Sequence, residues 1–136
     1  MIKLNRPLRL IQTAKRRNDF EGLEQQAFFD WLKLVHPFIR ALSFAIPNGG
    51  YRLKAEAIRL MKQGVTPGVP DLFVALPTEY YAGLFIEMKV GKNTTTGLQQ
   101  AFIARLREVG YRVDVCYSFE EAQAVLLDYI KGSKYV

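Results

Sequence analysis

Hydrophobic and polar positions along the chain change their period several times, and each period predicts a different element. Apolar residues recur at helical spacing in four segments: residues 20–35, 53–62, 96–109 and 118–131. Short runs rich in β-branched and aromatic residues predict strands at four places: residues 41–46, 72–76, 84–88 and 111–117. The predicted order is therefore helix, strand, helix, two strands, helix, strand, helix.

The connections between these segments predict how the strands pair. The strands at 72–76 and 84–88 are joined by a short loop, which is typical of an antiparallel hairpin. The strands at 84–88 and 111–117 are separated by a helix, so they should run parallel with a right-handed crossover. We expect a single α/β domain over residues 20–136, in which a mixed sheet is flanked by helices on both faces.

Ionisable residues lie at the outer ends of the predicted hairpin. If the hairpin is symmetric about Glu79, Asp71 lies opposite Glu87, and Lys89 projects from the same face as Glu87. Two like charges that face each other in a sheet repel, and a structural role gives no reason for them. A divalent cation does, because hard ions prefer carboxylate oxygens. The lysine could then hold an anionic substrate or a developing oxyanion.

Glu24 is a second unusual acid, because it lies on or beside the apolar stripe of the first predicted helix. A buried carboxylate must be neutral, paired or bound to a metal. At the edge of the stripe, Glu24 could simply reach water or pair with a lysine. Together with Asp71 and Glu87, it is better interpreted as a third acid of one site.

Charge is unevenly distributed along the chain of 136 residues, whose net charge is +6. The first twenty residues contain six basic residues and one acidic residue, whereas the remainder contains 13 and 12. Residues 1–19 therefore form a basic segment, either a solvated tail or an arm that follows a phosphate backbone. The turn at Asn48-Gly49 and the cations that follow it, Arg52, Lys54 and Lys62, are further candidates for phosphate contacts.

Several classes of protein are disfavoured by what the sequence lacks. The single cysteine, Cys116, excludes an internal disulfide and suits a reducing compartment, so we expect a cytoplasmic location. No apolar run approaches the roughly 18 residues of a membrane span. With His36 as the only histidine, triad and histidine-zinc chemistry have little support, and no glycine-rich motif indicates an organic cofactor.

Pro70-Asp71 followed by Glu87-Met88-Lys89 is similar to the PD-(D/E)XK nuclease signature. The succession of motifs around them resembles the VRR-NUC family in its small stand-alone form from phages and prophages, over about residues 21–130. The motifs that carry this resemblance are Glu24-Gln25 ahead of Trp31, the loop AIPNGG, PGVPDLF, IEMK, and Gln100 before Leu106-x-x-x-Gly110-Tyr111.

The resemblance implies a restriction-endonuclease-like αβββαβ core and a Mg²⁺- or Mn²⁺-dependent phosphodiesterase. Asp71 and Glu87 would bind the metal with the Met88 backbone carbonyl, and Lys89 would orient the attacking water or stabilise the transition state. Glu24 matches the helical acid of the motif and would be a further ligand of the metal. The motif glutamine falls on Gln100, although helical periodicity places Gln99 nearer the buried stripe.

These observations predict an endonuclease that acts as a homodimer on Holliday junctions or other branched DNA in repair, recombination or phage replication. The alternatives are a sequence-specific restriction-like endonuclease and a DNA-binding module without turnover. The location would be a bacterial or phage-infected cell. The residues expected to contact DNA are Asn48, Gly49, Arg52, Lys54, Lys62, Lys92, Arg16 and Arg17.

Overall fold

A mixed four-stranded sheet organises the computed structural model, which describes residues 8–47 and 53–136, with side chains in the first helix from Phe20 onward. The strand order is β1-β2-β3-β4. The strands span β1 Ser43–Ala45, β2 Leu72–Val74, β3 Leu84–Met88 and β4 Arg112–Cys116. The first three strands pair antiparallel, and β3 pairs with β4 in parallel. The predicted α/β class and mixed sheet are therefore confirmed.

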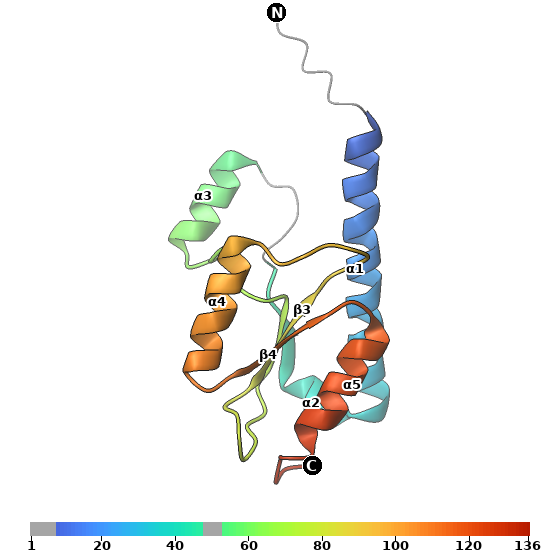
Figure 1. The fold of residues 1–136 in the computed structure, drawn as a ribbon, viewed down its shortest axis with the longest axis vertical. Coiled ribbons are helices and arrows are strands. Elements are labelled where there is room, and N and C mark those ends of the chain that lie inside the picture. Colours follow the sequence, from blue (N-terminus) through green and yellow to red (C-terminus); the bar gives the residue numbers. More distant parts are fainter. Residues whose placement is uncertain (1–7, 48–52) are drawn as a thin grey trace, which may run out of the picture.

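Helices cover both faces of this sheet, as the element order predicts (Figure 1). On one side α1 contacts both α5 and β3, and on the other α4 packs against β4. No helix in the described part of the chain has both the length and the apolarity that a membrane span requires. The helices span α1 Leu8–Val35, α2 Pro37–Ala41, α3 Lys54–Lys62, α4 Gly97–Glu108 and α5 Phe119–Ile130.

The main core lies between one face of the sheet and the helices α1 and α5. Alternate residues of β2, together with Leu84, Ile86 and Met88 of β3, are fully buried there. Phe28 and Leu32 of α1 pack onto this surface. Packing in the core therefore holds the two hairpin strands in place. This packing sets the positions of the residues at the ends of the hairpin.

The first helix differs from its prediction at both ends of the buried stripe. It begins at Leu8, twelve residues before the predicted start at Phe20. Phe20, Leu23 and Val35 are exposed, although they were expected to be buried, whereas Leu32 is fully buried. Among the α1 residues whose side chains are described, Phe28 and Leu32, in the C-terminal half of the helix, are the ones fully buried in the core.

Pro37 begins a short helix instead of only ending the first one. Pro37 occupies the first position of α2, where its missing N–H costs nothing. The predicted strand at 41–46 is therefore shortened to Ser43–Ala45. The next strand is also shorter than predicted and ends at Val74, although the Ala75 N–H still donates to the Leu42 carbonyl in register with the pairing of β1 and β2.

The remaining helices confirm the sequence signals at their ends. Thr96 caps α4 by accepting a hydrogen bond from the Gln99 N–H, and Ser118 caps α5 by accepting one from the Glu121 N–H. The sequence Ser-Phe-Glu-Glu at residues 118–121 is typical of a capping box, but the Glu121 carboxylate accepts from the Tyr117 N–H and not from the Ser118 N–H. Gly110 follows α4 with a φ of +100°, as a helix stop requires.

Candidate active site

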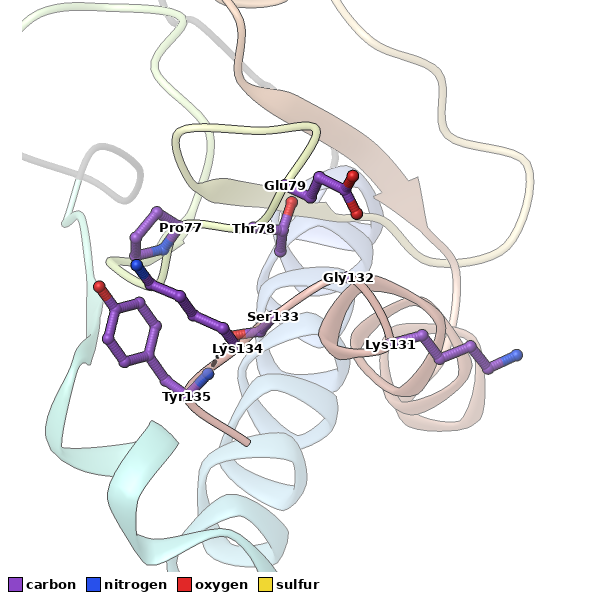
Figure 2. Close-up of a pocket in the computed structure, with 8 residues that line it drawn as sticks. All are labelled: Pro77, Thr78, Glu79, Lys131, Gly132, Ser133, Lys134 and Tyr135. Carbon is purple, nitrogen blue, oxygen red and sulfur yellow. Dashed lines mark hydrogen bonds between the residues drawn. The ribbon is translucent and has the colours of Figure 1, made fainter.

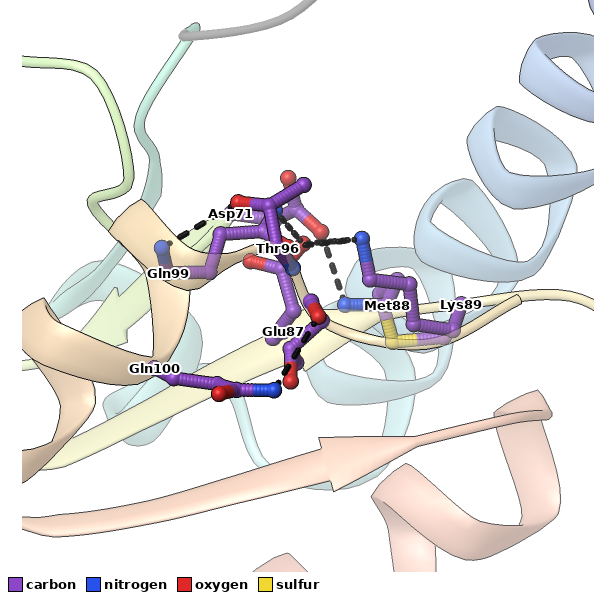
Figure 3. Close-up of polar contacts among 8 residues, drawn as sticks. Asp71, Glu87, Met88, Lys89, Thr96, Gln99 and Gln100 are labelled. Carbon is purple, nitrogen blue, oxygen red and sulfur yellow. Dashed lines mark hydrogen bonds and ion pairs between the residues drawn. The ribbon is translucent and has the colours of Figure 1, made fainter.

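The register of the hairpin brings the two predicted carboxylates together. Leu72 pairs with Ile86, so the same register extended by one residue places Asp71 opposite Glu87. The Lys89 N–H donates to the Cys116 carbonyl, which continues the strand past Glu87. Glu87 and Lys89 therefore project from one face, and their side chains form an ion pair with 3.3 Å between Nζ and Oε1 (Figure 3).

Both carboxyl groups have raised pKa values. For Asp71, burial raises the pKa, while a hydrogen bond of 2.7 Å from the Met88 N–H to Oδ2 opposes the shift. For Glu87, burial raises the pKa to about 7, with the Asp71 charge as the next cause, and Lys89 opposes both. The Asp71 charge therefore disfavours the ionisation of Glu87, whereas interaction with the Glu87 carboxyl lowers the pKa of Asp71.

One carboxylate oxygen of this pair has no hydrogen-bond partner among the described residues. Glu87 is 3% exposed, and its Oε2 is buried and unpaired. A buried acceptor without a partner is rare in folded proteins and destabilises them. Such an atom, opposite a second carboxylate, is what a bound cation would satisfy, so the residues present fit a divalent metal.

Gln99 connects the carboxylate pair to the first turn of α4. Its Nε2 donates to Glu87 Oε1 at 2.9 Å, and its Oε1 accepts from Lys89 Nζ at 3.1 Å (Figure 3). The same oxygen accepts from the Thr96 N–H at 2.8 Å, so the cap of the helix fixes the side chain. Gln99 therefore orients both charged groups.

Gln100, the expected motif glutamine, lies outside this network. It donates to the Thr95 carbonyl at 3.2 Å, and no hydrogen bond joins it to Glu87 or Lys89 among the described residues. Helical periodicity places Gln99, one position earlier, on the face of the helix that meets the sheet. The role of Gln100 in catalysis stays a prediction.

Glu24, the expected acid on α1, makes a hydrogen bond outside the carboxylate pair, and its role in the site stays a prediction. The Glu24 carboxylate accepts a hydrogen bond from the Phe119 N–H at the start of α5, so it caps that helix. Glu21, one helical turn earlier, is the α1 acid whose charge raises the pKa of both Asp71 and Glu87. The spacing of three residues puts both glutamates on one side of the helix, and the sequence analysis named Glu24 alone.

The segment before Asp71 is held against α4 by a glycine. Gly68 has a φ of +89°, and a Cβ there would lie 2.7 Å from the Leu98 carbonyl oxygen. Only glycine fits this close approach without displacing one backbone or the other. The contact joins the loop that carries Asp71 to the helical turn that carries Gln99.

The predicted DNA-contacting residues are spread over several regions. Asn48, Gly49 and Arg52 lie outside the described residues, and Arg16 and Arg17 lie in α1 where side chains are not described. Lys54 and Lys62 are exposed at the two ends of α3, and Lys92 is exposed in the loop after β3. The described members of this set lie on two separate elements, and their role in DNA binding stays a prediction.

The described residues contain no cluster of three or more His, Cys, Asp or Glu side chains arranged to hold a metal. The donor set of the site is instead a pair of carboxylates with a third acid nearby. A hollow of about 610 Å³ lies elsewhere, between the hairpin loop and the C-terminal residues (Figure 2). Its lining includes Thr78, Lys134 and Tyr135 and none of the residues of the carboxylate pair.

Comparison with known proteins places this geometry in a family. The model of the VRR-NUC domain matches residues 17–120. The chain is similar to a solved structure described as a VRR_NUC domain protein, with a TM-score of 0.73 and 27% sequence identity. That similarity covers 84% of this chain and 90% of the other. No match was found among the curated proteins.

The matched region includes every element of the sheet and the residues of the carboxylate pair, Lys89 and Gln99. The match spans more than half of the chain, and the paired acids with an adjacent lysine agree with a nuclease-type domain that processes DNA. The chain belongs to the VRR-NUC family of the PD-(D/E)XK nuclease superfamily.

Proposed function

We propose that the protein is an endonuclease that requires Mg²⁺ or Mn²⁺, hydrolyses phosphodiester bonds in DNA and prefers branched DNA. The observation that carries this proposal is the buried, unpaired Oε2 of Glu87 opposite Asp71. A protein without a ligand at this position would gain stability by replacing either acid. The arrangement therefore supports a cation as the missing partner.

Asp71 and Glu87 would hold the ion, and Glu21 would add negative charge close to it. Bound there, the metal would polarise the scissile phosphate and lower the pKa of a water molecule. Two protein carboxylates leave most positions of a hard cation for water and phosphate oxygens, as substrate binding requires.

Lys89 is the group best placed to act on the phosphate. Its side chain is mostly shielded from solvent and is already paired with Glu87, so it is held beside the site without reaching far from the strand. A lysine ammonium there can donate hydrogen bonds to a phosphate oxygen or to the attacking water. Gln99 keeps it aligned, because the amide oxygen accepts from the ammonium.

The basic segment 1–19 would add affinity that does not depend on DNA sequence. It holds most of the net charge of the chain, whereas residues 20–136 are nearly balanced. Each phosphate that such a segment neutralises steepens the dependence of log K on log salt by about 0.9 on duplex DNA. Lys54, Lys62 and Lys92 would make further phosphate contacts.

A homodimer would supply the two sites that a symmetric junction needs. Each chain holds one carboxylate pair and therefore one active site. Coordinated cuts in two strands require two sites, and a two-fold dimer would present them to a two-fold-symmetric four-way junction. The free thiol of Cys116 is buried, which suits our proposal that the enzyme acts in the reducing cytoplasm of a bacterial or phage-infected cell.

The test is to incubate a four-way junction, the matching linear duplex and a plasmid with Mg²⁺, Mn²⁺ or EDTA. We expect metal-dependent nicking near the branch point, no cleavage in EDTA, and no cleavage by an Asp71→Asn control that still binds DNA. Bands at defined plasmid sequences would instead favour a restriction-like enzyme. Tight binding without any cleavage under all conditions would refute the enzymatic proposal.

A further inference from the structure

The outer face of α3 combines apolar and basic side chains in an ordered pattern. Lys54, Ile58, Met61 and Lys62 occupy positions i, i+4, i+7 and i+8 of the helix, so they share one face. Ile58 is 45% exposed and Met61 is 55% exposed. The face thus presents two apolar side chains between two lysines.

Burial in this chain does not explain these apolar residues. No residue of α3 is fully buried, and only Ala57 and Leu60 are half-buried, so the helix contributes little to the core. Figure 1 shows α3 at the edge of the molecule, beyond the first turn of α4. The face of Ile58 and Met61 is therefore available to a partner.

Charge indicates what kind of partner this is. The helix carries Lys54, Arg59 and Lys62 against Glu56 alone, and all four side chains are exposed. Within the ranges that the structure describes, none of the three cations pairs with a carboxylate. A surface of unpaired cations around an apolar centre is complementary to a polyanion with apolar groups inside it, as DNA is.

The helix also lies close to the carboxylate pair along the chain. Eight residues after its last turn, the chain reaches Pro70 and then Asp71. On the way, Gly68 packs against Leu98 in the helical turn that also carries Gln99. DNA that occupies the carboxylate site would therefore pass near α3.

We propose that the outer face of α3 is a DNA-docking surface that recognises opened or sharply bent base steps. Ile58 and Met61 press on exposed base faces as apolar wedges, and Lys54 and Lys62 hold the phosphates on either side. The two lysines are separated by about 12 Å along the helix axis, enough to straddle a minor groove about 6 Å wide. This proposal rests on the proposed function and extends it to substrate choice.

A wedge of this kind selects branched DNA for an energetic reason. Inserting an apolar side chain requires bases to unstack, which costs free energy in an intact duplex. At a branch point the bases are already partly unstacked or easily deformed, so the same contact is less costly there. The α3 face would thus distinguish a junction from a linear duplex without reading its sequence.

The test compares binding of the Ile58→Ala/Met61→Ala double variant to a four-way junction and to a linear duplex, by fluorescence anisotropy in EDTA. Junction affinity should fall about tenfold, because two apolar side chains are truncated. Duplex affinity and the salt slope should not change, because the charge of the protein stays the same. The matched control is Leu34→Ala, which truncates an apolar side chain that is 84% exposed on α1.

The complementary variant, Lys54→Gln/Lys62→Gln, should flatten the salt slope on both DNAs by about 0.9 for each phosphate that the protein no longer neutralises. A 2-aminopurine at the branch point should brighten when the unsubstituted protein binds and stay dim with the Ile58→Ala/Met61→Ala variant. Equal junction affinity and equal 2-aminopurine signals for both proteins would overturn the proposal. A change in mass by light scattering, with DNA binding unaltered, would assign the face to a second copy of this chain and overturn it as well.

These outcomes are separable from the failure of the proposed function. Metal-dependent nicking of the four-way junction is measured with the same proteins, and Asp71→Asn, whose α3 face is unchanged, should still bind junctions selectively while nicking nothing. Loss of junction selectivity in Ile58→Ala/Met61→Ala, with selectivity retained in Asp71→Asn, supports the wedge. If the unsubstituted protein binds junctions through Ile58 and Met61 but nicks nothing, the docking surface holds and the enzymatic proposal fails.

Discussion

Buried polar groups at the two ends of the hairpin differ in whether they have a hydrogen-bond partner. At the loop end, the Tyr129 hydroxyl is buried and donates a hydrogen bond of 2.6 Å to the Leu76 carbonyl. At the other end, Glu87 is equally buried, yet its Oε2 has no partner among the described residues, and the nearest acid repels it. The buried hydroxyl at the loop end therefore has a partner within the chain, whereas a buried carboxylate oxygen at the other end has none among the described residues.

This difference distinguishes a buried polar group with a structural role from one with a functional role. A buried hydroxyl with a partner contributes modestly to stability and specifies the packing around it. A buried carboxylate beside a second carboxylate lowers stability unless a cation is present. This destabilising pair lies at the end of the sheet where the side chains of Lys89 and Gln99 also meet.

The strongest way to sharpen the comparison is to remove one polar group at each end. Glu87→Gln should abolish cleavage and yet stabilise the metal-free protein at pH 8, by on the order of 1–3 kcal/mol, because it removes a buried charge. Tyr129→Phe should destabilise the protein by about 1–2 kcal/mol and leave cleavage unchanged. Thermal unfolding in EDTA and nicking assays in Mn²⁺ measure both effects. Normal cleavage by the Glu87→Gln variant would contradict the functional role assigned to the buried carboxylate.

The stabilisation by Glu87→Gln should depend on pH in a defined direction. The pKa of Glu87 is raised from 4.5 to about 7 in the folded protein, so its ionisation opposes folding at every pH above that range. The penalty is complete above pH 7 and disappears as pH falls through 7 toward 4.5. The advantage of the variant over the parent protein should therefore vanish in acid. An advantage that grows as pH falls would contradict the assigned cause.

Lys89→Met should produce the next largest effect. Turnover should fall about 10²-fold, the scale on which the loss of one transition-state donor acts, while DNA affinity changes little. Single-turnover cleavage and anisotropy separate the two quantities. Lys92→Met should show the opposite pattern, because Lys92 is exposed three residues further on and is expected to contact phosphate: its loss should lower DNA affinity and leave single-turnover cleavage at saturating DNA unchanged. If weaker binding accounts for the entire loss in the Lys89 variant, this lysine is an ordinary phosphate contact.

The two glutamates of α1 provide a matched pair. Glu21→Gln should weaken Mn²⁺ binding about tenfold, because it removes a charge that acts on both carboxylates. Glu24→Gln should spare Mn²⁺ binding and lower thermal stability, because it weakens the bond to the Phe119 N–H. The reverse assignment of effects would restore Glu24 as the acid of the site.

The neighbouring glutamines of α4 offer the smallest and most selective test. Gln99→Ala should lower turnover several-fold to about tenfold, because Lys89 and Glu87 lose a shared hydrogen-bond partner. Gln100→Ala should leave turnover unchanged, because that side chain bonds only to the Thr95 carbonyl in this region. Steady-state rates of the two variants suffice, and equal losses would mean that the α4 network is not what aligns the lysine.

Most of the site could be predicted from sequence because it depends on strand geometry. A strand has a period of two, and a short hairpin loop fixes its register, so Asp71 and Glu87 could be placed opposite each other from their positions alone. The same period put Lys89 on the face of Glu87. The strands that carry these residues are buried and short, which makes their pattern clear.

The helical members of the site could not be chosen with the same certainty. Three or four neighbouring positions of a helix lie near any one partner, so Glu21 and Glu24, or Gln99 and Gln100, differ only in the packing of the helix. Glu24 reaches α5, and that contact depends on how two distant helices meet. Gly68 likewise reveals its role only through the approach of Leu98.

Direct titration with Mn²⁺ tests the central claim, that Asp71 and Glu87 together hold a divalent cation. Calorimetry at pH 8 without DNA should show saturable binding to the parent protein. Glu87→Gln and Asp71→Asn should each abolish it, whereas Tyr129→Phe should bind as the parent does. Equal Mn²⁺ binding by the parent protein and both carboxylate variants would contradict the account, because the ion would then be held elsewhere.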